Sequence, residues 1–183
     1  MTTIYKLTDA NMQTRGGFQW TLGESRTAPG GGALCTSAWL HAYTDPLVGA
    51  FVAPVYSPFN RPRLFRGEGE IGDFGGGLIV GCTKAVLHEE LLVPTVTTAQ
   101  RVRFAILCAR EVCEDPTWRA WAERWLSGED CRAGAAARAA AGVPAVWAAA
   151  EAVWAAAEAA QSAPLDLPAL ARCAVEEEER SAS

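Results

Sequence analysis

One histidine and two aromatic residues alternate along a short stretch of the chain. His41 lies between Trp39 and Tyr43, and on a strand these three side chains would occupy alternate positions. A histidine can donate, accept or titrate near neutral pH, so this stretch could face a ligand in an aromatic pocket. The alternative, which we favour, is a histidine at the edge of the core that bonds to backbone atoms.

A second stretch combines an arginine and a glutamine with a tryptophan. Arg15 and Gln19 beside Trp20 could hold an anionic, planar ligand through a guanidinium contact and ring stacking. An arginine on a surface turn explains the pattern equally well. The candidate ligand-binding residues are therefore Arg15, Gln19, Trp20, His41 and Tyr43, and a small nucleotide-like molecule is one ligand class that fits them.

The sequence shows no complete set of nucleophile, base and acid for catalysis. The chain has two histidines, His41 and His88, and a Ser/Cys–His enzyme would need one of them beside a nucleophile such as Cys35. The six cysteines include no CxxC pair, which indicates reduced, mostly buried thiols rather than a zinc site. The glycine clusters match no phosphate-binding motif and indicate flexible loops. We therefore predict no catalytic residues, no metal and no cofactor.

The charge balance restricts the partners. The formal net charge is −5 and the sequence pI is about 5.1, whereas nucleic-acid binders normally present a basic surface. General nucleic-acid binding is not expected, although Arg61, Arg63 and Arg66 could form a local basic patch. The first residues lack the pattern of a secretory leader, and no apolar run reaches the roughly 18–20 residues that span a bilayer. These features predict a cytoplasmic protein without membrane contact.

The composition of the chain changes near Pro94. Glycine, proline and β-branched alternation dominate before it, and alanine, arginine and glutamate at helical spacing follow it. We predict an α+β protein, with a small β-sheet domain and a short helix at residues 1–94 and an all-α helical region at 95–183. The expected strands are 4–8, 17–22, 39–44, 63–70 and 84–93.

Capping signals predict where the helices begin. They are Asp45-Pro46, for a helix that should stop before Pro54; Thr97 with Gln100 as a capping box; Asp115-Pro116; and Asp166. The apolar stripe expected on the helix after Thr97 is Val102, Ala105, Ile106, Ala109, Val112 and Cys113. On the helix after Pro116 we expect Trp118 and Trp121 to be core residues.

A heptad-like seam lies in the Ala-rich part of the chain. Val146, Trp147, Val153 and Trp154 share one helix face with small alanine residues. This combination suits close helix packing. We expect the four residues to pack helices together or to join copies of the chain in an oligomer.

In the order of its motifs, the chain resembles a family of small proteins found in bacteriophage and prophage genomes. The motifs, within residues 4–92, are Tyr5-Lys6, Gly17-Phe-Gln-Trp20, Leu34-Cys35, Trp39-Leu-His41, Asp45-Pro-Leu47 and the strand from Phe65 to Gly69. A related subset shares the segments Thr97 to Val102 and Trp125 to Asp130. The chain departs from many relatives at Ser37-Ala38, where they have glycine. The resemblance implies a phage or mobile-element origin, hence action in the host cytoplasm, and it supplies no chemistry.

These observations support three functional hypotheses. The favoured one is a non-catalytic phage-type binding protein that sequesters a small molecule or engages a host protein, with self-association through its helices. The second is a degenerate ADP-ribosyltransferase-like enzyme that uses His41, Tyr43 and Glu68, by analogy of strand and helix order. The third is a virion structural component.

Overall fold

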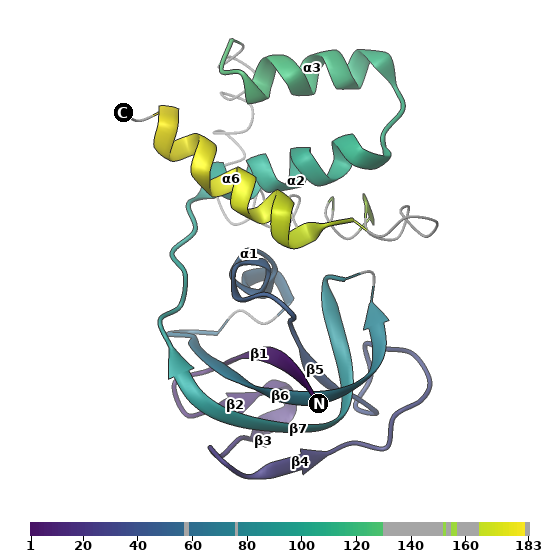
Figure 1. Cartoon of the computed structure of the whole chain (residues 1–183), viewed down its shortest axis with the longest axis vertical. Coiled ribbons are helices and arrows are strands. Elements are labelled where there is room, and N and C mark those ends of the chain that lie inside the picture. The colour runs from purple at the N-terminus through teal and green to yellow at the C-terminus, as the bar shows by residue number, and fades with distance from the viewer. Residues whose placement is uncertain (57–58, 76, 130–151, 153–154, 157–164, 182–183) are drawn as a thin grey trace. The chain divides into compact units, whose positions relative to one another are not determined.

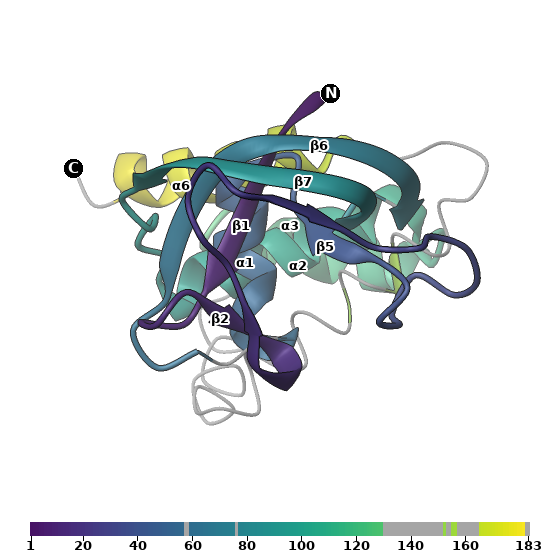
Figure 2. The same cartoon turned by 90° about the horizontal axis from the view of Figure 1, so that it is seen from below.

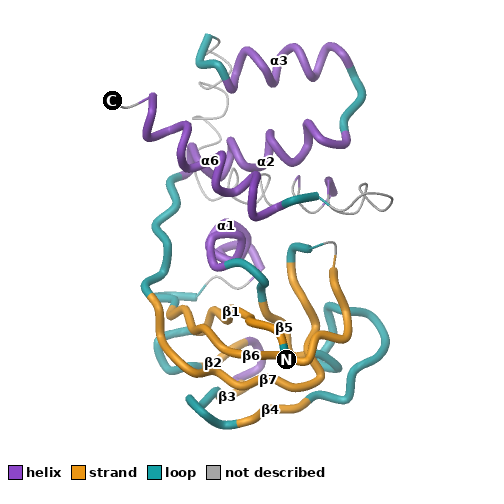
Figure 3. The backbone as a smooth tube through the Cα atoms, viewed as in Figure 1, coloured by secondary structure: helices purple, strands orange, loops and turns teal. Residues whose placement is uncertain are grey.

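The computed structural model describes residues 1–56, 59–75, 77–129, 152, 155–156 and 165–181. The chain forms two compact units, Met1–Thr95 and Val96–Ser183. The first unit is built on an antiparallel five-stranded sheet and the second contains helices (Figures 1 and 3). The predicted α+β class is therefore confirmed.

Two long strands form the centre of the sheet. The strands are β1 (Thr2–Thr8), β2 (Gln13–Thr14), β3 (Phe18–Gln19), β4 (Ser25–Thr27), β5 (Leu40–Ala42), β6 (Arg63–Gly75) and β7 (Ile79–Leu91). The order is β1-β6-β7-β4, with β5 also paired to β7, while β2 and β3 form a separate two-stranded ribbon. β6 is longer than expected because it continues to Gly75, and β7 is longer because it already begins at Ile79.

The sheet curls until its two sides meet. Tyr43, just after β5, forms an antiparallel bridge with Tyr5 of β1, and each amide donates to the other's carbonyl at 2.8 Å. We call this contact the β1–β5 seam. In Figure 2, β6 and β7 arch over β1 and β5. The curl gives the sheet an inner and an outer face.

Each face carries its own apolar cluster. The inner face holds Ile4, Trp20, Leu40, Ala42, Phe65, Val80, Cys82, Ala85 and Leu87. The cluster on the outer face is centred on Leu7, Tyr43 and Leu64. Strand alternation therefore places Ile4, Lys6 and Thr8 of β1 towards the inner face. A lysine is thus placed among apolar residues.

Glycines on the outer face of the β6–β7 hairpin admit a large side chain. A Cβ atom at Gly72 would lie 2.7 Å from Cζ3 of Trp39, and one at Gly81 would lie 2.9 Å from the same indole. At Gly81 it would also lie 2.5 Å from Leu34 Cδ1. The bare backbone at Gly72 and Gly81 therefore lets Trp39 and Leu34 pack directly onto the strands.

Helix α1 (Pro46–Tyr56) comes directly after the β1–β5 seam in the chain. Oδ1 of Asp45 accepts from the amides of Leu47 and Val48 at 2.8 and 3.1 Å, so the predicted cap is confirmed. The prediction that this helix stops before Pro54 was wrong. A proline removes one amide donor, and the buried apolar residues earlier in the helix hold it against that loss.

The expected strand at 17–22 was also wrong in its extent. Only Phe18 and Gln19 form a strand, and they pair with β2. Trp20 is 2% exposed, whereas Phe18 and Leu22 are 39% and 45% exposed. The chain leaves the ribbon after Gln19, and Trp20 then joins the inner cluster.

In the second unit, α2 (Thr98–Val112) contacts both α3 (Pro116–Leu126) and α6 (Leu167–Ser181). The capping box of Thr97 and Gln100 is present, and the carboxylate of Asp115 accepts from two amides of α3. Asp166 likewise accepts from the amide of Ala169 at 3.0 Å. The capping predictions for these three helices are confirmed.

The buried face of α2 differs from the predicted stripe. Phe104, Leu107 and Cys108 are buried in addition to the predicted Ala105 and Ile106. The other predicted members, from Val102 to Cys113, are half-buried. Because α2 contacts two helices, its buried face is wider than one stripe.

Two further predictions concern tryptophans of the helical unit. Trp118 and Trp121 are half-buried rather than fully buried, with ring centroids 5.9 Å apart. The seam of Val146, Trp147, Val153 and Trp154 lies outside the described residues, so its packing role stays a prediction.

Candidate functional site

The five predicted ligand-binding residues do not form one pocket. Trp20 belongs to the inner cluster and Tyr43 to the outer cluster. Gln19 donates to the carbonyls of Asn11 and Trp20 at 3.0 and 2.9 Å, so its amide holds the local backbone. Arg15 begins an exposed 3₁₀ turn. Trp20 is too buried to stack on a ligand.

His41 makes a backbone contact of the kind we favoured. Its Nε2 hydrogen-bonds to the carbonyl oxygen of Leu34, and because a carbonyl oxygen only accepts, Nε2 must carry the proton. Burial lowers the pKa of His41, the bond to Leu34 raises it, and the nearby charge of Lys6 lowers it again. In this arrangement His41 anchors the loop before β5.

The sequence reasoning missed Lys6. Its side chain is 9% exposed, and its ammonium donates to the carbonyl oxygen of His41 across the β1–β5 seam. The same ammonium lies over the ring of Trp20, 5.4 Å from the centroid. The signal was present in the alternation of Ile4, Lys6 and Thr8, which places the lysine on the apolar face of the strand.

The charge on Lys6 is poorly compensated. Burial lowers the pKa of its ammonium to about 8, and the Cys82 thiol acts in the opposite direction. Burial also raises the pKa of Cys82 to about 11, so this neighbour is a neutral thiol at pH 7. Within the described part of the chain, no carboxylate pairs with Lys6, and His41 O is the one acceptor for its three N–H groups.

An aromatic pair connects this lysine with an arginine nearer the surface. The rings of Trp20 and Phe18 meet edge to face with centroids 5.4 Å apart, and the Arg26 guanidinium lies 5.9 Å from the Phe18 centroid. Arg26 bonds to Glu24 at 2.9 Å, yet its buried Nε has no acceptor among the described residues. We call Lys6, Trp20, Phe18 and Arg26 the cation–aromatic column.

The residues suggested for an ADP-ribosyltransferase-like site lie on different strands. Glu68 belongs to β6, which pairs with β1 and β7 rather than with β5. Its carboxylate lies 3.8 Å from Nε2 of His88. The Nε2 of His41 is bonded to Leu34 instead. The described structure gives no support to a joint role of Glu68 with His41.

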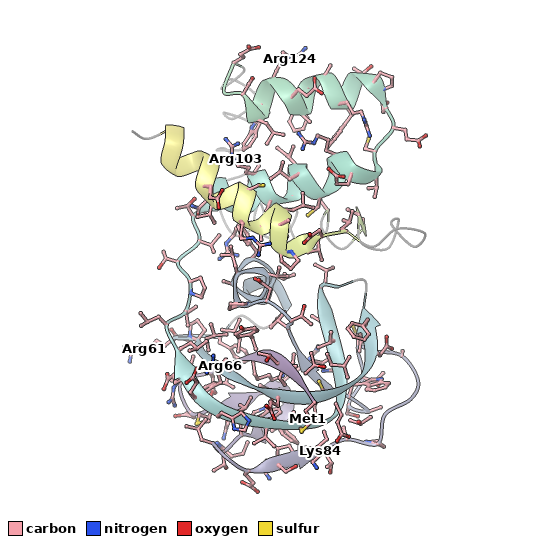
Figure 4. All side chains as sticks on the ribbon, in the orientation of Figure 1. Met1, Arg61, Arg66, Lys84, Arg103 and Arg124 are labelled. Carbon is pink, nitrogen blue, oxygen red and sulfur yellow. The ribbon has the colours of Figure 1, made fainter. Side chains whose placement is uncertain are left out.

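The suspected basic patch is largely neutralised. Arg63 forms two hydrogen bonds with the carboxylate of Glu90 at 2.8 and 2.6 Å, and Arg66 pairs with Glu89 at 2.8 Å. Arg61 and Arg66 lie at the same side of the sheet unit (Figure 4). Pairing with carboxylates leaves little net positive charge there for phosphates.

The cysteines are less buried than expected. Of those described, Cys82 and Cys108 are buried, Cys113 is half-buried, and Cys35 and Cys173 are exposed free thiols. No cluster of three or more metal-ligating side chains occurs in the described ranges. A search of the same ranges finds no helix with the length and apolar character needed to cross a membrane.

Comparisons of the chain with protein-family models, with curated proteins and with solved structures give no match.

Proposed function

We propose that the protein is a non-catalytic binding protein that holds a small anion at the ammonium of Lys6. The observation that carries this proposal is a buried cation with one hydrogen-bond acceptor and no carboxylate among the described residues. Buried donors in folded proteins are normally satisfied by protein, water or a bound ion. An anion would satisfy the free N–H groups and compensate the charge together.

The ligand class is a compact carboxylate or a similar small anion. The ammonium of Lys6 lies over the Trp20 ring, and the rings of Trp20 and Phe18 meet edge to face, which leaves little room for a stacked aromatic ligand. A nucleotide-like molecule therefore fits the site less well than a small acid. The motif resemblance supports a phage origin and action in the host cytoplasm, with sequestration of such a ligand as the role.

Thermal unfolding of the full-length chain in glycolate, phosphate or chloride tests this proposal. A ligand that binds only the folded state raises the melting temperature with concentration. We expect at least one of these anions to stabilise the wild type and Lys84→Met equally. Lys6→Met should lose that stabilisation. Equal stabilisation of Lys6→Met, or no effect of any anion on the wild type, would contradict the proposal.

A protein partner is a second candidate, favoured by the exposed end of the column. Phe18 of the column is 39% exposed, and its neighbour Leu22 is 45% exposed. The Arg26 guanidinium lies over the Phe18 ring. Aromatic residues and arginine are enriched at interfaces. Native mass spectrometry would report assembly state and retained ligand or partner together. A Phe18→Ser/Leu22→Ser variant that keeps every assembly of the wild type would contradict this candidate.

A further inference from the structure

We propose that Lys6 is a reactive amine that captures small oxo acids, which are carboxylates bearing an aldehyde or ketone group, as an imine. This inference rests on the proposed anion site and names its ligand class more closely. Imine formation requires an unprotonated amine. At this site the carboxylate of the ligand must also lie beside that amine.

The surroundings of Lys6 make its proton easier to lose than that of an exposed lysine. Its neighbours are the Trp20 ring, the neutral Cys82 thiol and the carbonyl oxygen of His41. The titratable side chains that act on it from the packed strands are Cys82 of β7 and His41 of β5. Neither of them supplies a negative charge at pH 7, so no described carboxylate or thiolate opposes the loss of the Lys6 proton. Desolvated lysines of this kind are the ones that form Schiff bases.

The chain offers an internal contrast for this chemistry. Lys6 and Lys84 are its two lysines, and all other strongly basic side chains are arginines. Arginine stays protonated in proteins and cannot act as an amine nucleophile. Lys84 lies half-buried on β7 (Figure 4) and pairs in register with Thr27. The buried position on β1 therefore carries a basic side chain that can lose its proton.

The bond changes balance without an oxidant or reductant. The lone pair of Lys6 Nζ attacks the carbonyl carbon, and a C–N bond forms. The two amine hydrogens leave with the carbonyl oxygen as one molecule of water, and an imine remains. The carbonyl oxygen of His41 accepts a hydrogen bond from the attacking amine, which orients its lone pair away from β5.

A carboxylate on the ligand is required by the burial of the product. An imine that takes up a proton carries a positive charge in the same place as the original ammonium. Because no described carboxylate lies beside it, the ligand must bring the compensating charge itself. A neutral aldehyde would leave that charge unpaired, so oxo acids are favoured over simple aldehydes.

Reductive trapping on the full-length protein tests the inference. The probe is glyoxylate with cyanoborohydride at pH 7, which converts an imine to a stable carboxymethyl amine, and peptide mass spectrometry locates it. The competing amines are Lys84 and the N-terminus. We expect Lys6 to react at least about tenfold faster than Lys84, because each unit of lowered pKa gives about tenfold more neutral amine. Lys84→Met should leave the Lys6 adduct unchanged.

Two variants and one analogue separate the outcomes. Lys6→Arg keeps a cation and Lys6→Met removes it, and both should abolish the adduct, so failure of one to fold leaves the other informative. Modification confined to Lys84 or the N-terminus would overturn the inference. Glycolate, which has no carbonyl group, reports the anion site alone. Stabilisation by glycolate without a Lys6 adduct would reject imine formation and retain the binding function. A Lys6 adduct without any effect of glycolate would support imine formation and reject the anion-binding function.

Discussion

A lysine in an apolar cluster opposes the stability of the fold that contains it. Lys6 shares the inner face with Ile4, Phe65 and Cys82, and a methionine would fit such a face without desolvating a charge. The hydrogen bond to His41 O offsets part of that loss. Groups that are unfavourable for stability are common at functional sites. The unfavourable burial of Lys6 therefore points to a functional role for this residue.

Lys6→Met is expected to stabilise the protein at pH 7 by about 1–3 kcal/mol. Burial lowers the Lys6 pKa from 10.5 to about 8, and about 1.4 kcal/mol corresponds to each unit. Loss of the bond to His41 O reduces the gain. Urea unfolding of both proteins at pH 7 measures the difference, and a destabilised Lys6→Met would contradict the prediction.

The same substitution should remove one component of the pH dependence. Between about pH 8 and 10.5 the unfolded state binds the Lys6 proton and the folded state does not, so stability rises with pH in this window. Below pH 8 the loss is complete and constant. The advantage of Lys6→Met over the wild type should therefore shrink as the pH rises from 8 to 10.5. Lys84→Met serves as the control, and a gap that stays constant would count against the burial of a charged Lys6.

His41 should make the fold sensitive to mild acid. Its pKa is lowered by burial, so the unfolded state takes up a proton first as the pH falls below about 6.5. Stability is therefore full above this pH and is lost as the pH falls towards the folded-state pKa. We expect His41→Gln to show a smaller loss of stability between pH 7 and 5 than the wild type. Unfolding curves at both pH values measure it, with His88→Gln, an exposed position, as the control.

At the scale of elements, the helix starts could be predicted from the sequence, whereas the pairing of the strands could not. The caps at Asp45, Thr97 and Asp115 each act within a few residues, so the sequence contains the whole interaction. The seam between Tyr5 and Tyr43 joins strands far apart in the chain, and no local signal specifies it. Trp20 is buried among residues of several distant strands, which no local signal specifies, so the sequence suggested an exposed ring that could stack on a ligand.

The glycine positions of the hairpin yield a prediction at the same scale. A Cβ atom at Gly81 would lie 2.5 Å from Leu34 and 2.9 Å from Trp39, so Gly81→Ala must displace the loop that precedes β5. Overpacking of this kind costs about 1–3 kcal/mol. Chemical denaturation measures the loss, and Lys84→Ala on the same strand is the control. A Gly81→Ala protein as stable as the control would show that Trp39 does not pack tightly on β7.

At the scale of the molecule, the change in composition near Pro94 indicated two kinds of structure along the chain. The structure has its β-strands and helix α1 in Met1–Thr95 and the helices α2, α3 and α6 in Val96–Ser183. The curl of the sheet was beyond sequence reasoning, because strand order and register depend on contacts between distant residues. The alternation along β1 places Lys6 on the apolar face, but its contacts with His41 and Trp20 depend on that curl and follow only from the three-dimensional arrangement.

The first unit contains the two apolar clusters of its sheet and the contacts that close the sheet. Its apolar clusters, the β1–β5 seam and the cap of α1 all lie within residues 4–93. We therefore expect a fragment of residues 1–95 to unfold cooperatively and to give a dispersed amide NMR spectrum, as a chain with its own core does. Glyoxylate trapping should still select Lys6 in this fragment. An unfolded fragment would mean that the sheet depends on residues beyond 95, and the reactivity of Lys6 would then be a property of the whole chain.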